Sequence, residues 1–204
     1  MSTATAAILS PAVTPVAKQS PAPSKAVTLD AYFKKYRDLE DGFKYELVNG
    51  NVEKTHRTMT PAQTFILNNL MRRFIGTKAY ENGGNLFVEI EMLTKPDQIH
   101  KPDICYRSAK QIVDGDFSPS EFVVEVISPN DKFEKVKDKL REYFAAGVKV
   151  VWHIFPAHLE VEVYTSARRS DVFSGADTVS AAPAIPDFQL KVDEVFKKTV
   201  VSAS

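Results

Sequence analysis

Two acidic residues inside apolar runs are the part of this sequence with the clearest chemistry. Asp103 lies in Lys-Pro-Asp-Ile-Cys-Tyr (101–106), and Glu125 lies in Phe-Val-Val-Glu-Val-Ile (122–127). A carboxylate within a buried strand costs free energy unless a cation or hydrogen-bond donors meet it. A lysine-rich segment, 131–142, follows directly. Two such acids beside a basic partner predict a divalent metal site of the kind that hydrolyses phosphodiesters.

Each acid also has a plainer interpretation. Asp103 follows a proline and could cap or turn the end of a strand. Glu46 could sit on the exposed face of a hairpin. Glu125 has the weakest alternative, because an acid between two valines is hard to explain by solvation unless its strand lies at a sheet edge. Glu89 and Glu91 alternate with apolar residues, which predicts a solvated strand face.

The lysine-rich segment predicts an amphipathic helix over 131–146, stopped by Gly147. Its apolar stripe, expected to face a sheet, is Phe133, Val136, Leu140, Tyr143 and Phe144. Lys132 and Lys139 fall together on one flank of this stripe, so they are the lysines best placed to approach Glu125. The helical wheel leaves open which of the two does so. For any single lysine, a solvated, salt-bridged helix face is the plainer alternative.

The remaining patterns predict an α/β domain. Asn49-Gly50 lies between strand-like runs and favours a tight hairpin. The helix after Glu125 can cross between neighbouring parallel strands, while antiparallel pairing of the earlier strands is equally allowed. The other expected elements are helices over 28–36 and 61–75, strands over 85–93, 103–106, 121–127, 148–154 and 159–165, a polar loop, and a closing segment over 188–196.

Composition sets modest limits. The chain has 204 residues, of which 44% are hydrophobic, and this suits one domain over 28–199. Lys plus Arg equals Asp plus Glu, 26 against 26, so nucleic-acid binding would have to use a local patch. The single cysteine, Cys105, fits a reducing cytoplasm. No apolar run is as long as a membrane span.

Residues 1–27 differ from the rest of the chain. They are rich in Ala, Pro, Ser, Thr and Val, contain four prolines, and have no acid. This composition predicts a disordered tail. A secretory signal is the alternative, but the segment has no basic start and prolines interrupt its apolar stretch.

Several short motifs, taken in order, resemble the Uma family, which is abundant in bacteria and assigned to the restriction-endonuclease-like PD-(D/E)XK superfamily. Each motif alone is common, but their order and spacing are specific. The resemblance covers residues 29–196. The motifs are Tyr-Glu-Leu-Val-Asn-Gly (45–50), Pro-Asp (102–103), Val-Glu-Val-Ile-Ser-Pro (124–129), the segment 139–143 with Ala-Gly-Val (146–148), and the run from Ile-Pro-Asp-Phe (185–188) to Phe196.

The resemblance implies a mixed central sheet flanked by helices. It also implies a metal, Mg²⁺ or Mn²⁺, held by Asp103, Glu125 and the main-chain carbonyl of Val126. The usual superfamily lysine would fall at Ile127, and in the Uma pattern it lies instead on the following helix, at Lys139. Lys139 is one of the two lysines that the helical wheel indicates independently.

Two further positions bear on function. Glu46 matches the family's early acid, which would complete the metal shell or hold a water. Gln63 stands where many relatives carry a histidine, which weakens any acid–base role there. We therefore expect a metal-dependent endonuclease acting on DNA, with Lys132 and Lys101 as phosphate contacts.

An interpretation from a different class is a catalytically silent nucleic-acid-binding or assembly module with the same fold. The displaced lysine, Gln63 and the neutral net charge favour this alternative. Assembly as a homodimer is a further hypothesis, since nucleases of this superfamily often cut two strands as dimers; the interface would be an edge strand or the apolar closing segment, 188–196.

Overall fold

The computed structural model describes residues 26–57 and 59–198, so most of the predicted tail lies outside the described residues. The helices are α1 (Leu29–Tyr36), α2 (Pro61–Phe74), α3 (Lys78–Glu81), α4 (Ala109–Val113), α5 (Phe133–Ala145) and α6 (Val192–Val195). The strands are β1 (Phe43–Val48), β2 (Asn51–His56), β3 (Asn85–Val88), β4 (Met92–Lys95), β5 (Gln98–His100), β6 (Ile104–Arg107), β7 (Phe122–Val126), β8 (Val150–Phe155), β9 (Glu160–Ser166), β10 (Arg169–Ser174), β11 (Thr178–Ala181) and β12 (Ile185–Lys191). No helix in this part of the chain is long and apolar enough to cross a membrane.

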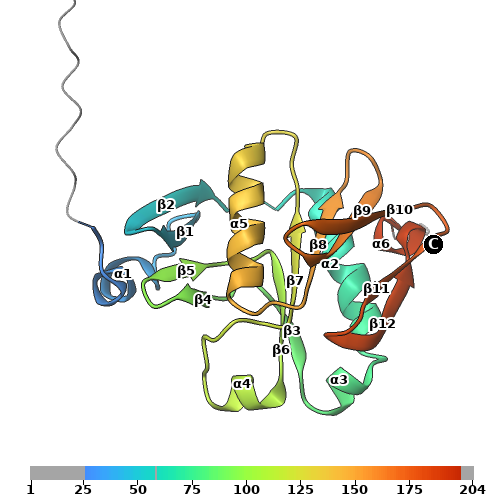
Figure 1. The fold of residues 1–204 in the computed structure, drawn as a ribbon, viewed down its shortest axis with the longest axis horizontal. Helices are drawn as coiled ribbons and strands as arrows, with labels where there is room; N and C mark the ends of the chain where they lie inside the picture. Colours follow the sequence, from blue (N-terminus) through green and yellow to red (C-terminus); the bar gives the residue numbers. More distant parts are fainter. Residues whose placement is uncertain (1–25, 58, 199–204) are drawn as a thin grey trace, which may run out of the picture.

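The strands form a six-stranded sheet in the order β10-β9-β8-β7-β6-β3, a four-stranded sheet in the order β2-β1-β5-β4, and a two-stranded ribbon of β11 and β12 (Figure 1). Within the large sheet, β7 and β8 are parallel and the other pairs are antiparallel. Helix α5 connects the parallel pair, as a crossover requires. The predicted mixed sheet and crossover helix are both confirmed.

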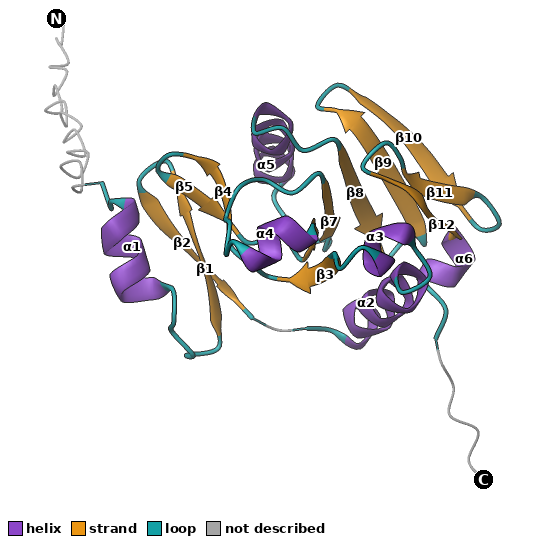
Figure 2. Cartoon of the chain, turned by 90° about the horizontal axis from the view of Figure 1, so that it is seen from below, coloured by secondary structure: helices purple, strands orange, loops and turns teal. Residues whose placement is uncertain are grey.

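Helices cover both faces of the large sheet, with α5 on one side and α2 on the other (Figure 2). Phe122 and Val124 of β7 belong to the apolar cluster that contains the buried side chains of α2, whereas Val123 packs with those of α5. Side chains alternate along a strand, so Glu125 shares the α5 face with Val123. By the same alternation, Asp103 shares that face with Cys105 of the neighbouring strand β6.

Local sequence signals account for several element boundaries. Asn49 and Gly50 adopt positive φ, 50° and 73°, and close the β1–β2 hairpin as predicted. Thr28 caps α1 by accepting the Ala31 N–H at 3.2 Å. Helix α2 begins with a capping box between Thr60 and Gln63, which confirms the helix expected from residue 61.

The predicted strand 85–93 is divided, because Glu89 has a φ of 49° and turns the chain out of the large sheet. β3 stays in that sheet, and β4 joins the four-stranded one. The expected solvated face is wrong for Glu91, which is 6% exposed and pairs with Arg37 at 3.1 Å. Residues 98–100, to which no element was assigned, form β5, and the polar loop expected after 165 contains β10.

The closing segment packs inward. Phe188, Leu190, Val192 and Val195 are at most 4% exposed and join the same cluster as Trp152. Burying such apolar side chains stabilises the fold by roughly 2 kcal/mol each. The segment is therefore part of the core and is not available as an exposed dimer surface.

Candidate active site

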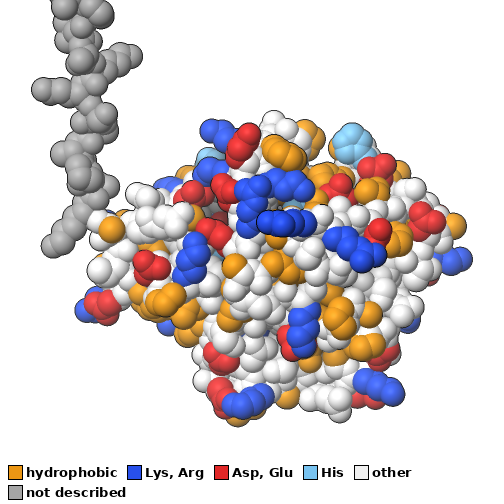
Figure 3. Space-filling model, viewed as in Figure 1, with side chains coloured by type: hydrophobic (Ala, Val, Ile, Leu, Met, Phe, Trp, Pro, Cys, Tyr) orange, Lys and Arg blue, Asp and Glu red, His pale blue; other side chains and the backbone are white. Residues whose placement is uncertain are grey.

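The predicted site residues meet in a cavity of about 1070 Å³ between the β1–β2 hairpin, α5 and the adjoining ends of β6 and β7. Glu46, Asp103, Glu125 and Lys139 all line it. These residues come from β1, the position just before β6, β7 and α5, so only the tertiary structure brings them together. Figure 3 shows lysine and arginine side chains gathered on the face around α5, with acids among them.

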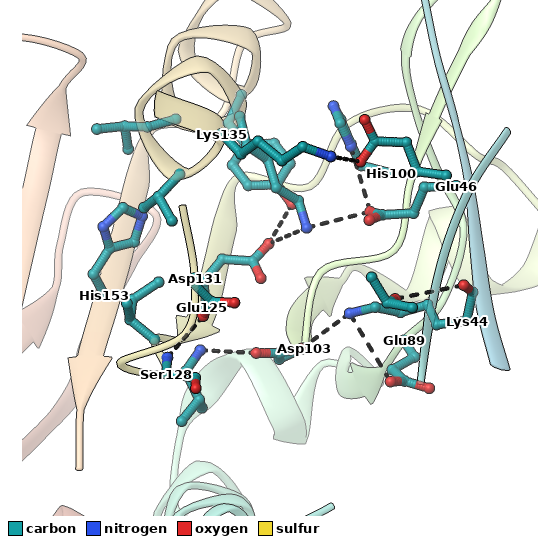
Figure 4. Close-up of a pocket in the computed structure, with 18 of the residues that line it drawn as sticks. Lys44, Glu46, Glu89, His100, Asp103, Glu125, Ser128, Asp131, Lys135 and His153 are labelled. Carbon is teal, nitrogen blue, oxygen red and sulfur yellow. Dashed lines mark hydrogen bonds and ion pairs between the residues drawn. The ribbon is translucent and has the colours of Figure 1, made fainter. Parts of the chain in front are cut away.

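Asp103 is held between two neighbouring elements (Figure 4). Its Oδ2 accepts the Val126 N–H at 2.8 Å, and its Oδ1 accepts from Lys44 Nζ at 3.2 Å. Asp103 could have been a residue that merely caps or turns a strand end. That interpretation is incomplete, because its carboxylate also links β7 to β1. In a strand, the N–H and C=O of one residue point to the same edge, so the Val126 carbonyl faces the Asp103 side too.

Lys139 contacts two acids at once. Its Nζ lies 2.9 Å from Oε1 of Glu125 and 3.2 Å from Oε1 of Glu46. Tyr143, one helical turn later, donates its hydroxyl to the same Glu125 oxygen at 2.5 Å. Lys132 lies at the N-cap of α5, exposed at the cavity mouth. The helical wheel left open whether Lys132 or Lys139 approaches Glu125. In the structure, Lys139 makes this contact.

Glu46 belongs to the interior of the cluster. It is 9% exposed, so the alternative of an exposed hairpin face is wrong. Its Oε1 accepts the Lys101 N–H at 2.6 Å and lies 3.4 Å from Nδ1 of His100. The other ring nitrogen of His100 lies 2.7 Å from Oε2 of Glu142. A polar network thus links β1 and β5 of the four-stranded sheet to Glu142 on α5.

Burial and charge act in opposite directions on the two glutamates. Burial opposes ionisation of Glu46, but Lys139 and His100 outweigh it and hold the pKa of that carboxyl well below its usual range. Burial raises the pKa of Glu125; Lys139 opposes this shift and the Asp103 charge adds to it. Although burial disfavours its charge, the surrounding carboxylates raise the pKa of Lys139, so it stays protonated. A further cation beside Glu125 would favour its charged form and so oppose the effect of burial.

Lys44 lines the same cavity, although the sequence did not indicate it as a candidate. Besides Asp103, its ammonium lies 4.0 Å from Glu89 (Figure 4). It also donates to the Lys101 carbonyl at 3.3 Å. Glu89 is covered from outside by Arg57 at 2.7 Å. Strand alternation could have identified Lys44, since it lies two positions before Glu46 and on the same strand face.

Two other residues, one predicted to contact phosphate and one considered for acid–base catalysis, have structural roles instead. The Lys101 side chain is only 7% exposed and ends 3.5 Å from Glu91, so as a phosphate contact it is wrong. The reason is the buried charge of Glu91, which the sequence analysis placed in solvent. Gln63 lines the cavity, but its side chain accepts the Thr60 N–H at 2.8 Å in the α2 capping box.

Phe133 also departs from expectation. It was expected in the stripe that faces the sheet, but it is 68% exposed, whereas Leu140 and Tyr143 are fully buried. The helix begins at Phe133, so this residue lies beyond the part of α5 that the sheet covers. The contact face of α5 is therefore its second half, which carries Lys139.

The donor set fits a hard cation. Three carboxyl groups, those of Glu46, Asp103 and Glu125, face the two ammonium groups of Lys44 and Lys139. In the described residues no three His, Cys, Asp or Glu side chains converge as a ready-made metal cage. Mg²⁺ is commonly held by one or two carboxylates, with waters and substrate oxygens as the remaining ligands. Two carboxylates with the Val126 carbonyl match that mode.

Comparison with known proteins agrees with this architecture. Residues 30–193 match the model of a family, Uma2, described as "Putative restriction endonuclease". The chain belongs to the Uma2 family. The predicted resemblance is thereby confirmed over nearly all of the described residues. A search of curated proteins found no match.

A solved structure supports the Uma2 fold. It is a protein of Anabaena variabilis described as "a putative nuclease belonging to DUF820", and the match has a TM-score of 0.67 at 20% sequence identity. The match covers 83% of this chain and 97% of the Anabaena chain. At this identity the likeness establishes the fold, which is the restriction-endonuclease-like fold that the motifs predicted.

Proposed function

We propose that this Uma2 protein is a metal-dependent nuclease of the PD-(D/E)XK type that hydrolyses phosphodiester bonds in DNA. The observation that carries the proposal is the buried cluster in which Lys139 contacts Glu125 beside Asp103, within a cavity open to substrate. The description of the family and that of the Anabaena protein both name nucleases, which supports the same reaction class.

The proposed roles follow from position. Asp103, Glu125 and the Val126 carbonyl would hold Mg²⁺ or Mn²⁺. When bound, the cation would lower the pKa of a water and offset charge on the phosphoryl oxygens. Lys139 lies between two carboxylates that stabilise its charged form, so we assign it the orientation of the attacking water and the neutralisation of phosphoryl charge. Glu46 fixes Lys139 from the other side.

Recognition of the nucleic acid is assigned to the cavity mouth. Lys132, Lys135 and Arg57 line it and are exposed. Acids are at least as frequent as bases along the cavity lining, so we expect few phosphate contacts and no extended basic track. Contacts of this kind do not read bases, and no sequence specificity follows from them.

The test is cleavage of single- and double-stranded DNA and RNA with Mg²⁺ or Mn²⁺. We expect metal-dependent cleavage of DNA by the wild type and its loss in Asp103→Asn. Asp138→Asn is the matched control, because Asp138 also lines the cavity but pairs with Arg141 at the surface. Full activity in Asp103→Asn would refute the proposed site.

One observation favours the silent binding module instead. Both oxygens of Asp103 already have donors, from Lys44 and from the Val126 N–H. A module that uses these contacts only for structure would need no cation. Calorimetric titration with Mn²⁺ separates the two functions: heat of binding that Asp103→Asn abolishes supports the nuclease, and its absence in the wild type supports the module.

A further inference from the structure

Tyr143 has a hydroxyl whose position is unusual for a core residue. The ring is fully buried in the apolar cluster between α5 and the large sheet, with Val123 and Val151. A buried tyrosine hydroxyl needs a hydrogen-bond partner. Here the partner is Oε1 of Glu125, at 2.5 Å. The His100 ring packs edge-on against the Tyr143 ring, with 5.6 Å between the ring centroids. The hydroxyl thus ends inside the proposed site.

The two oxygens of Glu125 are treated differently. Oε1 receives both the Tyr143 hydroxyl and the Lys139 ammonium, at 2.5 and 2.9 Å. Lys139 and Tyr143 are four positions apart on α5, so one helix face presents both donors. Among the described residues, no hydrogen bond or ion pair to Oε2 is formed, and Oε2 is not one of the buried unpartnered atoms. Oε2 is therefore the oxygen that opens to the cavity.

We propose that Tyr143 is a positioning residue, which fixes Oε1 of Glu125 so that Oε2 is presented to the divalent cation. This inference rests on the proposed metal-dependent function. A hydroxyl suits the task because it orients the carboxylate without adding positive charge, and the cluster already contains Lys139 and Lys44. Partners that orient a metal ligand in this way typically contribute about tenfold to a hundredfold in metal affinity or activity.

The test uses two tyrosines from the same apolar cluster. Tyr164 is 3% exposed and donates its hydroxyl to Oε2 of Glu162 at 2.5 Å, outside the acid cluster. We expect Tyr143→Phe to weaken Mn²⁺ binding, measured by calorimetry, by about tenfold to a hundredfold. Tyr164→Phe should leave Mn²⁺ affinity unchanged. In both variants the melting transition without metal shows whether the core still packs cooperatively.

A rescue separates the hydroxyl from the ring. Replacing Tyr143 by 4-aminophenylalanine restores a donor at the same place, and we expect it to recover most of the lost Mn²⁺ affinity. If only the ring packing mattered, Tyr143→Phe would bind Mn²⁺ as tightly as the wild type, because its ring packs in the same way.

Three outcomes would overturn the inference. Wild-type Mn²⁺ affinity in Tyr143→Phe would do so while leaving the proposed nuclease function standing. A Tyr143→Phe chain without a cooperative melting transition would mark the hydroxyl as structural. Absence of Mn²⁺ binding in the wild type would remove the proposed function itself, and the inference with it.

Discussion

Replacement of Lys139 by alanine tests how far the buried cluster depends on one ammonium group. A lysine on the flank of a helix ordinarily adds little to stability. This one is only 20% exposed in its side chain and contacts Glu46 and Glu125, which are themselves 9% and 8% exposed. Removing one partner of a buried ion pair typically costs about 3–5 kcal/mol, because the remaining charge is left uncompensated. We expect a loss of that size for Lys139→Ala without metal.

The same helix provides a matched control. Lys135 Nζ lies 2.8 Å from Oε2 of Glu53, a distance as short as any that Lys139 makes, but the Lys135 side chain is 62% exposed. Exposed pairs contribute about 0–1 kcal/mol. Urea denaturation in the presence of a chelator measures both variants by linear extrapolation. Each variant exchanges one lysine of α5 for alanine, so the difference between them reports burial and not helix propensity.

Activity provides the second measurement. We expect Lys139→Ala to lower metal-dependent cleavage by roughly a hundredfold or more, the scale seen when one preorganised electrostatic group is lost. Equal stability of Lys139→Ala and Lys135→Ala would refute the reasoning about the buried cluster. Full activity in Lys139→Ala together with an inactive Lys132→Ala would transfer the catalytic role to Lys132.

Four other results are expected. Mn²⁺ should raise the melting temperature of the wild type but not of the double variant Asp103→Asn plus Glu125→Gln, and an undiminished rise in that variant contradicts the ligand assignment. Burial, with Lys137 nearby, lowers the pKa of His153 to about 4, so its neutral form stabilises the fold above pH 6.5. This contribution to the free energy of unfolding, up to about 3 kcal/mol, should be lost as the pH falls from about 6.5 to 4. Urea denaturation across this pH range measures the loss, which should be absent in His153→Gln. DNA affinity should fall with salt at a log–log slope shallower than about −3, whereas a slope near about −6 would indicate an extended basic track. We expect a homodimer that pairs through the edge strand β10, which light scattering would detect and which Val172→Lys should dissociate. A wild type that is monomeric at micromolar concentration would contradict this prediction.

Local patterns in the sequence predict the elements that depend on neighbouring residues. The Asn49-Gly50 turn, the capped start of α2 and the amphipathic α5 follow from backbone preferences and side-chain spacing, which act over a few residues. An acid inside an apolar strand is equally visible, because its burial without a partner would be unfavourable. The sequence alone is therefore sufficient to select Asp103 and Glu125 as candidate site residues.

Only the tertiary structure decided how these acids are partnered. The helical wheel left Lys132 and Lys139 equivalent, and the depth at which α5 meets the sheet distinguishes them. The division of 85–93 at Glu89 depends on strand pairing far along the chain, which local periodicity does not record.

The contacts of Lys44 and Lys101 depend on the tertiary structure for the same reason. Lys44, in the four-stranded sheet, contacts Asp103 beside the six-stranded sheet, whereas the Lys101 side chain points inward to Glu91. A charged side chain takes its environment from residues that are distant in sequence, and its interaction energy changes steeply with burial. The sequence thus determined which groups could form the site, and the packing of β1, β7 and α5 determined which of them meet.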